Sequence, residues 1–215
     1  MLRHLLLDLD ETLYSAETGL WPAIRERINL FMIECLHLPP AEVPALRQRY
    51  YEQYGTSLMG LQQDFNVDAA EYLAFVHDLP LAHYLQPDGA LNAMLARVPL
   101  QKSVFTNADA PHAQRVLAHL GIAQHIAHIV DITALNFVNK PAPGAYARAL
   151  EILGARAAEC AYADDALRNL LPARALGMTT IHVGHAPEHL NGADYHVPTV
   201  HGVERVLAGL IGQRN

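Results

Sequence analysis

Two aspartates, Asp8 and Asp10, follow a short leucine-rich run near the start of the chain. The run predicts a buried parallel strand, and residues two apart in a strand share a face, so we expect both carboxylates to point the same way. Close carboxylates repel each other unless a proton or a cation lies between them, and a hard divalent ion is the usual solution. The alternative is a strand followed by a turn, in which Asp10 or Thr12 caps the next segment.

Polar residues also follow three later apolar runs. Each of them alone has a structural explanation as a turn residue, a helix cap or a solvated lysine. If the runs are parallel strands whose carboxyl ends meet at one edge of a sheet, their side chains together suit a metal ion and a phosphoryl group. The residues are Thr106 and Asn107, Asp131, and the pair Asp164 and Asp165, with Lys140 in the loop before a predicted helix.

Hydrophobic periodicity predicts an α/β protein with a helical insertion. Strands expected over 103–106, 128–130, 160–163 and 179–183 alternate with helices expected over 88–98, 110–120, 143–153, 167–176 and 203–211. This alternation is typical of a parallel sheet. Only helices are expected before it, over 20–38, 40–54, 58–65 and 69–77.

The predicted architecture is therefore a Rossmann-like three-layer core with an inserted all-helical cap. We assign residues 1–14 and 87–215 to the core and residues 15–86 to the cap. An insertion that leaves the end of the first strand starts at the edge where parallel sheets bind ligands, so we expect it to act as a lid.

Composition excludes several classes of function. The 215 residues are 51% hydrophobic and 17% charged, which predicts an ordinary globular protein. The formal charge of -7 argues against nucleic acid as a partner. We expect no membrane span and no signal peptide, a cytoplasmic location, and buried reduced thiols at Cys35 and Cys160. The 13 histidines lack the spacing of a metal motif, so we expect core or solvated side chains.

The order of the motifs resembles the haloacid dehalogenase superfamily in its phosphatase form, over nearly the whole chain. The resemblance implies that Asp8 is a nucleophile that forms an aspartyl-phosphate, and that Asp10 protonates the departing alkoxide. It also implies that Mg²⁺ is held by Asp8, Asp10 and Asp165, with Asp164 assisting. The matching motifs are Asp8-Leu9-Asp10-Glu11-Thr12-Leu13-Tyr14, Thr106-Asn107, Lys140-Pro141, and Asp164-Asp165 with Asn169.

The same resemblance implies roles for the other site residues. Thr106, the Asn107 backbone amide and Lys140 would bind the phosphoryl group in transfer. Asn169 would orient Lys140 or the acid pair. Dehalogenases of this superfamily lack the second acid because a halide leaves without a proton, so Asp10 implies a phosphate ester as substrate.

Two stretches, 54–61 and 75–80, together with His112-Ala113 after Thr106-Asn107-Ala108, are similar to the pyrimidine 5′-nucleotidase group. This similarity implies a small phosphorylated substrate, a nucleoside 5′-monophosphate. A basic residue is common in that group where this chain has Met59, which bears on nucleotide specificity. Three alternatives stay open: a sugar-phosphate or phosphoglycolate phosphatase, a phosphomutase on the same scaffold, and a non-catalytic protein that binds a phosphorylated ligand. The sequence sets no oligomeric state.

Overall fold

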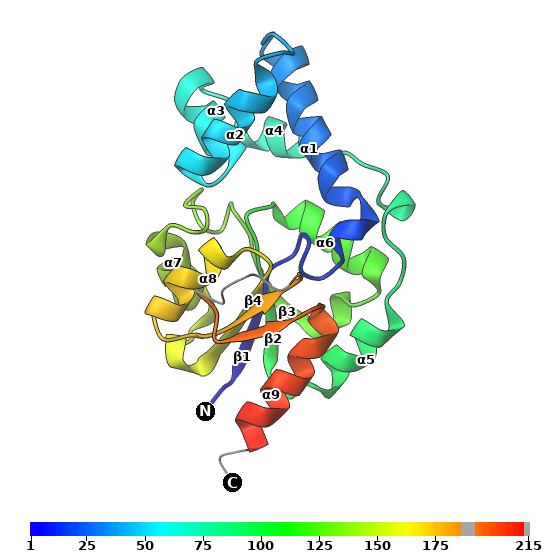
Figure 1. Ribbon diagram of the computed structural model, residues 1–215, viewed down its shortest axis with the longest axis vertical. Helices are drawn as coiled ribbons and strands as arrows, with labels where there is room; N and C mark the ends of the chain where they lie inside the picture. The colour runs from blue at the N-terminus through cyan, green and yellow to red at the C-terminus, as the bar shows by residue number, and fades with distance from the viewer. Residues whose placement is uncertain (186–191, 213–215) are drawn as a thin grey trace. The chain divides into compact units, whose positions relative to one another are not determined.

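The chain divides into two compact units. The computed structural model describes residues 1–185 and 192–212. One unit contains residues 1–15 and 85–215, and the other contains residues 16–84. Figure 1 shows the strands in the first unit and helices in the second. The boundaries expected from the sequence, 15–86 for the insertion, stay a prediction, as does its action as a lid. No helix among the described residues is long and apolar enough to cross a membrane.

A six-stranded parallel sheet forms the centre of the first unit, in the order β3-β2-β1-β4-β5-β6. It confirms the predicted α/β fold class. The sequence did not predict β6, a strand of three residues that is too short to carry a pattern of its own. The strands are β1 (His4–Leu7), β2 (Gln101–Phe105), β3 (Ile126–Val130), β4 (Cys160–Asp164), β5 (Thr179–Val183) and β6 (Tyr195–Val197).

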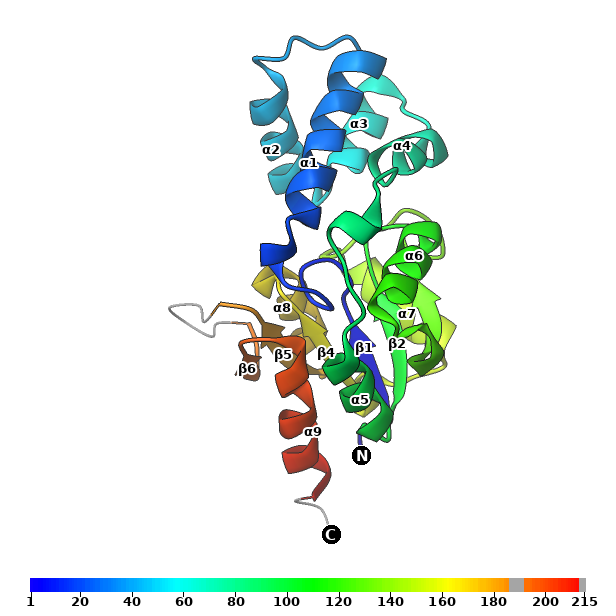
Figure 2. The same ribbon diagram turned by 90° about the vertical axis from the view of Figure 1, so that its right-hand side faces the viewer.

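Helices cover both faces of this sheet. Figure 1 shows α7 and α8 on one side and α5, α6 and α9 on the other. Figure 2 shows the same molecule turned by 90° about the vertical axis. Burial on both faces explains why Leu5, Leu6 and Leu7 form a continuous apolar run rather than an alternating one. The helices are α5 (Gly89–Arg97), α6 (Ala110–Leu120), α7 (Pro143–Leu153), α8 (Leu167–Ala175) and α9 (Val203–Gly212).

The core between the sheet, α7 and α8 is rich in aromatic side chains. The rings of Phe105 and Tyr146 meet edge to face, with centroids 5.3 Å apart and an interplanar angle of 83°. Tyr162 packs against both of them. Such pairs add about 1 kcal/mol beyond the area they bury. These rings lie beneath the carboxyl ends of β1, β2 and β4 and give the residues there a rigid support.

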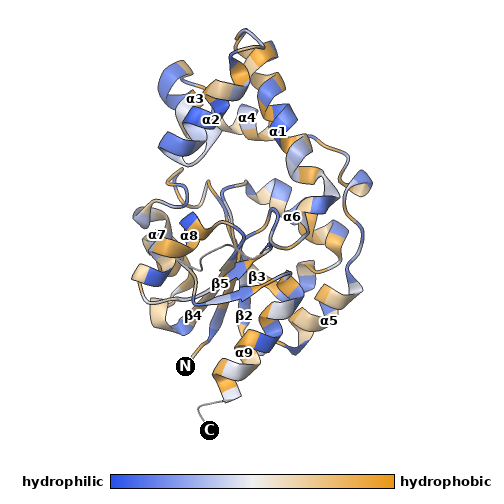
Figure 3. Ribbon diagram, in the orientation of Figure 1, coloured by the Kyte–Doolittle hydropathy of each residue, from blue (hydrophilic) through white to orange (hydrophobic). Residues whose placement is uncertain are grey.

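Four α-helices form the second unit: α1 (Leu20–Leu30), α2 (Val43–Tyr54), α3 (Ser57–Phe65) and α4 (Ala69–Val76). The prediction of one helix over 20–38 was wrong, because a π-helical turn, Phe31–Cys35, follows α1. Phe31 points inward there, edge-on to Tyr72 and Phe75. Figure 3 shows polar and apolar residues mixed along these helices, as expected of helices with one buried face.

The two cysteines differ in their surroundings. Both are free thiols, and Cys160 is buried in β4 as expected. Cys35 is exposed, which contradicts the prediction that both are buried. It lies at the end of the π-helical turn beside the exposed Glu34, while Phe31 and Met32 take the buried positions of that turn.

Candidate active site

The register of the sheet brings together the acidic residues that follow β1 and those at the end of β4. Leu7 of β1 pairs with Val104 of β2 on one side and with Ala163 of β4 on the other. The next residues along these strands, Asp8 and Asp164 among them, therefore share a row at the carboxyl edge of the sheet. The backbone N–H of Asp8 donates to the Ala163 carbonyl at 2.9 Å, which continues this alignment past the end of β1.

Lys140 is the centre of a buried polar network. Four acceptors surround the three N–H bonds of its Nζ: Asp8 Oδ1 at 2.7 Å, Asp164 Oδ2 at 3.0 Å, the Phe105 carbonyl at 2.8 Å and the Tyr162 hydroxyl at 2.9 Å. Only 1% of the residue is exposed. Burial opposes the charge of this ammonium, but Asp164 and Asp8 outweigh burial, so its pKa lies above the ordinary value.

Three carboxylates gather around this one ammonium. Oxygens of Asp8, Asp164 and Asp165 all lie within 4.8 Å of one another. Burial and the charges of the other two acids raise the pKa of Asp8 well above its usual value, against the opposing effect of Lys140. Burial, Asp164 and Glu11 raise the pKa of Asp165 to about 7. Hard oxygen donors with an excess of negative charge suit a divalent cation such as Mg²⁺.

The carboxyl group of Asp10 has other partners than that of Asp8. Its Oδ1 accepts a hydrogen bond from the Tyr14 hydroxyl at 2.6 Å and lies 3.0 Å from His112 Nε2. The expectation that the side chains of Asp8 and Asp10 point the same way requires a strand that runs through both residues. Strand β1 ends at Leu7, so side-chain alternation does not extend to Asp10. The three-acid cluster does not include its side chain.

Asn107 holds the backbone of Lys140. Its Oδ1 accepts from the Lys140 N–H at 2.8 Å, and its Nδ2 donates to the Lys140 carbonyl at 3.1 Å. Sequence reasoning considered only the backbone amide of Asn107 and missed this positioning contact. The neighbouring Thr106 is buried, and its hydroxyl accepts a hydrogen bond from the Ala108 N–H at 3.0 Å.

The acid pair after β4 has its own supports. Asn169 Nδ2 lies 3.1 Å from each carboxylate oxygen of Asp164. The sequence left open whether Asn169 orients Lys140 or the acid pair, and this contact is with the acid pair. The Tyr162 hydroxyl also donates to Asp164. Burial raises the pKa of Tyr162 well above its usual value, so this hydroxyl stays protonated. In the sequence, the only indication of this contact is that Tyr162 lies two residues before Asp164, which places both side chains on the same face of β4.

Asp131 lies outside this network although it also follows a strand. Its Oδ2 accepts from the Ala110 N–H at 2.9 Å and from the Thr133 hydroxyl at 2.6 Å, and its Oδ1 accepts from the Ala134 N–H at 3.0 Å. Asp131 therefore fixes the first residue of α6 and the loop after β3. Both of its oxygens are engaged with the protein.

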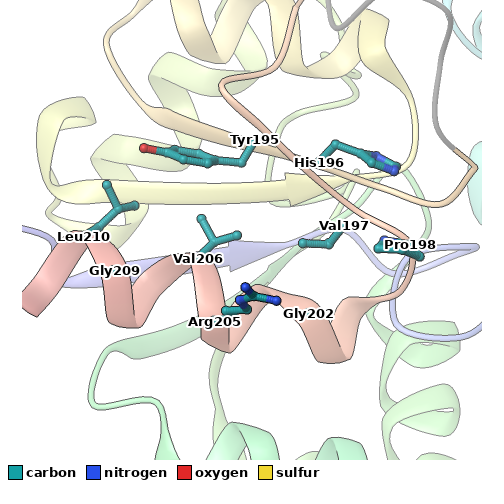
Figure 4. Close-up of a pocket in the computed structure, with 9 residues that line it drawn as sticks. All are labelled: Tyr195, His196, Val197, Pro198, Gly202, Arg205, Val206, Gly209 and Leu210. Carbon is teal, nitrogen blue, oxygen red and sulfur yellow. The ribbon is translucent and has the colours of Figure 1, made fainter.

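A groove between β6 and α9 is a separate feature of the same unit. Figure 4 shows Tyr195 and Val197 of β6 facing Arg205 and Val206 of α9 across it. It shares no residue with the carboxylate cluster, and its lining contains no acid. The chemistry that the motifs predict therefore belongs to the carboxyl edge of the sheet.

Comparison with known proteins gives matches over most of the chain. The family described as haloacid dehalogenase-like hydrolase matches residues 2–177. Phosphate metabolism protein 8 of Saccharomyces cerevisiae is 30% identical over 186 residues, which are 80% of this chain and 58% of that protein. The chain thus spans less than two thirds of the length of this relative.

Solved structures resemble the chain over nearly its whole length. The structure of a HAD phosphatase from Thermococcus onnurineus matches with a TM-score of 0.68 at 17% identity, covering 97% of this chain and 99% of that one. The structure of β-phosphoglucomutase from Clostridium difficile matches with a TM-score of 0.65 at 17% identity, covering 99% of each chain. At such identities the likeness is one of fold.

Proposed function

The chain belongs to the haloacid dehalogenase-like hydrolase family, and on that basis we propose that it is a Mg²⁺-dependent phosphomonoester hydrolase that forms an aspartyl-phosphate on Asp8. The observation that carries the proposal is the different surroundings of two acids. Asp8 lies against the Lys140 ammonium, while Tyr14 and His112 hold Asp10. One acid is thereby suited to attack phosphorus and the other to transfer a proton.

The proposed reaction has two steps. In the first, an oxygen of Asp8 attacks phosphorus, the bond to the ester oxygen breaks, and Asp10 gives its proton to the departing alkoxide. In the second, water attacks the phosphorus of the aspartyl-phosphate, Asp10 accepts a proton from that water, and Asp8 and inorganic phosphate are released. Thr106, the backbone N–H of Asn107 and Lys140 stabilise the charge on the equatorial oxygens.

The donor set fits Mg²⁺. Asp8, Asp165 and the backbone carbonyl of Asp10 would hold the ion, with Asp164 assisting. The bound ion supplies the positive charge that lets a phosphate dianion approach a carboxylate nucleophile. Lys140 alone does not neutralise the three carboxylates around it.

A pyrimidine nucleoside 5′-monophosphate is the proposed substrate. The similarity of residues 54–61 and 75–80 to the nucleotidase group supports this substrate, whereas the family match supports a hydrolase of this family and says nothing of the base. The departure at Met59 makes the base preference the part of the proposal to test first. We also propose a reducing, cytoplasmic location, because both cysteines are free thiols.

Phosphate release from a panel of monoesters tests the proposal. The panel contains pyrimidine and purine nucleotides, sugar phosphates and phosphoglycolate, each assayed with Mg²⁺ and with a chelator. We expect Mg²⁺-dependent release that is fastest with a pyrimidine nucleotide and lost in Asp8→Asn and Asp10→Asn. Asp68→Asn, a conservative change at the N-cap of α4, is the matched control.

Each alternative function has its own outcome in this assay. Fastest release from a sugar phosphate or phosphoglycolate would replace the nucleotide as substrate. Labelled phosphate retained on a sugar acceptor, with little free phosphate, would indicate a phosphomutase. Binding of phosphate esters without turnover of any of them would indicate a non-catalytic protein and contradict the proposal.

A further inference from the structure

Two buried donors from different parts of the chain meet on one oxygen of Asp10. Tyr14 is four residues further along the same loop, and His112 comes from α6, 102 positions away in sequence. The Tyr14 hydroxyl and His112 Nε2 lie 2.6 Å and 3.0 Å from the same atom, Oδ1. The His112 side chain is fully buried, and that of Asp10 is 13% exposed.

Both donors are held in place by neighbouring structure. His112 is the third residue of α6, and the first N–H of that helix donates to the buried carboxylate of Asp131 at 2.9 Å. Tyr14 is 6% exposed at the end of the loop that follows β1. A carboxylate accepts hydrogen bonds and does not donate them, so a tyrosine O–H and a histidine N–H point their protons at Oδ1.

The arrangement distinguishes the two oxygens of the carboxyl group. The torsion that rotates an aspartate carboxyl about its last bond is broad, so an unsupported carboxyl samples many orientations. Two donors on Oδ1 fix that torsion and favour negative charge on this atom. A proton on the same group then resides on Oδ2.

We propose that Tyr14 and His112 are positioning residues that fix the carboxyl group of Asp10 and assign its transferable proton to Oδ2. This inference rests on the proposed function, because it concerns the acid that protonates the departing alkoxide. Proton transfer requires heavy atoms within about 3 Å of each other, and a general acid contributes roughly a hundredfold or more to the rate. Loss of either donor therefore slows the steps in which Asp10 moves a proton, without removing the acid itself.

The choice of leaving group separates this role from a structural one. A nucleoside 5′-monophosphate releases a basic alkoxide that needs a proton, whereas 2,4-dinitrophenyl phosphate releases a stable phenolate that needs none. Rapid-mixing experiments measure the first step for each ester as the burst of released alcohol or phenolate. The variants are Tyr14→Phe, His112→Leu, and His112→Gln, whose side-chain amide keeps a donor near the position of Nε2.

We expect the burst rate with the nucleotide to fall about tenfold to a hundredfold in Tyr14→Phe and His112→Leu, a large part of the general-acid contribution. The burst rate with 2,4-dinitrophenyl phosphate should change less than about threefold. The steady-state rate with that ester should fall, because Asp10 must still accept a proton in the second step. His112→Gln should recover most of the loss.

Matched controls remove similar hydrogen bonds elsewhere. His201→Leu removes a contact of His201 Nε2 with Asp88 Oδ2, also at 3.0 Å. Tyr50→Phe removes a hydroxyl that donates to Asp64 at 2.5 Å in the helical unit. Both controls should keep the burst rates of the wild-type protein with both esters.

The possible results separate the inference from the proposed function. Wild-type turnover combined with equal losses of burst rate for both esters, or with no loss of burst rate in any variant, would overturn the inference alone. A loss of burst rate restricted to the nucleotide, with rescue by His112→Gln, would support it. Absence of release by the wild-type protein from every ester would overturn the proposed function and the inference with it.

Discussion

The Thr12 hydroxyl accepts a hydrogen bond from the backbone N–H of Asp165 at 3.0 Å and lies 3.4 Å from the Oδ1 of the same residue. This contact joins the loop after β1 to the loop after β4, across 153 positions of sequence. Thr12 is buried, and Asp165 is one of the three clustered acids. Thr12 therefore sets where one carboxylate of the candidate metal site lies.

We predict that Thr12→Val weakens Mg²⁺ binding by about tenfold or more, the usual effect of removing a group that orients a metal ligand. Valine keeps the shape of threonine and removes only the hydroxyl. Calorimetric titration of the protein with Mg²⁺ measures the effect. Thr12→Ser keeps the hydroxyl and should bind nearly as tightly as the wild type. Equal affinity in Thr12→Val would show that the contact does not position Asp165.

Asn107→Ala should lower kcat by about a hundredfold, because Lys140 would lose its backbone support. A shift of about 1 Å in a group that contacts the reacting phosphate lowers the rate by that factor. The substitution removes both hydrogen bonds between the Asn107 side chain and the backbone of Lys140. Asn92→Ala is the control, since Asn92 accepts from Gln124 in an exposed contact. A kcat within twofold of the wild type would contradict the positioning role.

Lys140→Met should destabilise the protein by about 3–5 kcal/mol, because removing one partner of a buried ion pair leaves the other charges uncompensated. Here Asp8 and Asp164 both lose their ammonium. Urea denaturation in the presence of a chelator measures the change. Lys102→Ala, a half-buried lysine of β2, should change the free energy of unfolding by less than about 0.5 kcal/mol.

Lys140→Arg tests whether charge alone is sufficient. The ammonium meets four acceptors in a small enclosed space, and a planar guanidinium has a different shape and donor geometry. We expect Lys140→Arg to remain destabilised by the same measurement. Full recovery of stability would show that the site requires only a positive charge.

The core of the fold was predictable because its signals are local. The central strands are short apolar runs, and the helices between them have one apolar face, so the parallel sheet followed from periodicity. The register then brought Asp8 and Asp164 together at one edge, as the position of each at the end of a run had suggested. Strand β6 was missed because three residues carry no periodic signal.

Other features depend on contacts that the sequence does not display. His112 reaches Asp10 from α6, across 102 positions of sequence, and Asp131 binds the first N–H of that helix. Cys35 is exposed because a π-helical turn interrupts the predicted helix after Leu30. Both outcomes are set by tertiary packing, which overrides the local pattern.

Gly60 of α3 faces the ring of Tyr50 in α2 at a very close approach. A Cβ at residue 60 would lie 2.2 Å from Tyr50 Cγ and 2.8 Å from Tyr50 Cβ. Alanine is the better helix former by about 1 kcal/mol, so intrinsic propensity favours Gly60→Ala. The clash opposes it, because overpacking a closed interface costs about 1–3 kcal/mol and Tyr50 is buried with little room to move.

We predict that the cost of the clash exceeds the gain in helix propensity, so that Gly60→Ala lowers the free energy of unfolding of the helical unit. Gly209 in α9 is the matched control, since a Cβ there would meet nothing within 4 Å. Gly209→Ala should therefore be neutral or stabilising by up to about 1 kcal/mol. Thermal unfolding followed by circular dichroism compares the two variants. If Gly60→Ala matched Gly209→Ala, α2 and α3 would have to separate at little cost, and the close packing of Gly60 on Tyr50 would not stabilise the unit.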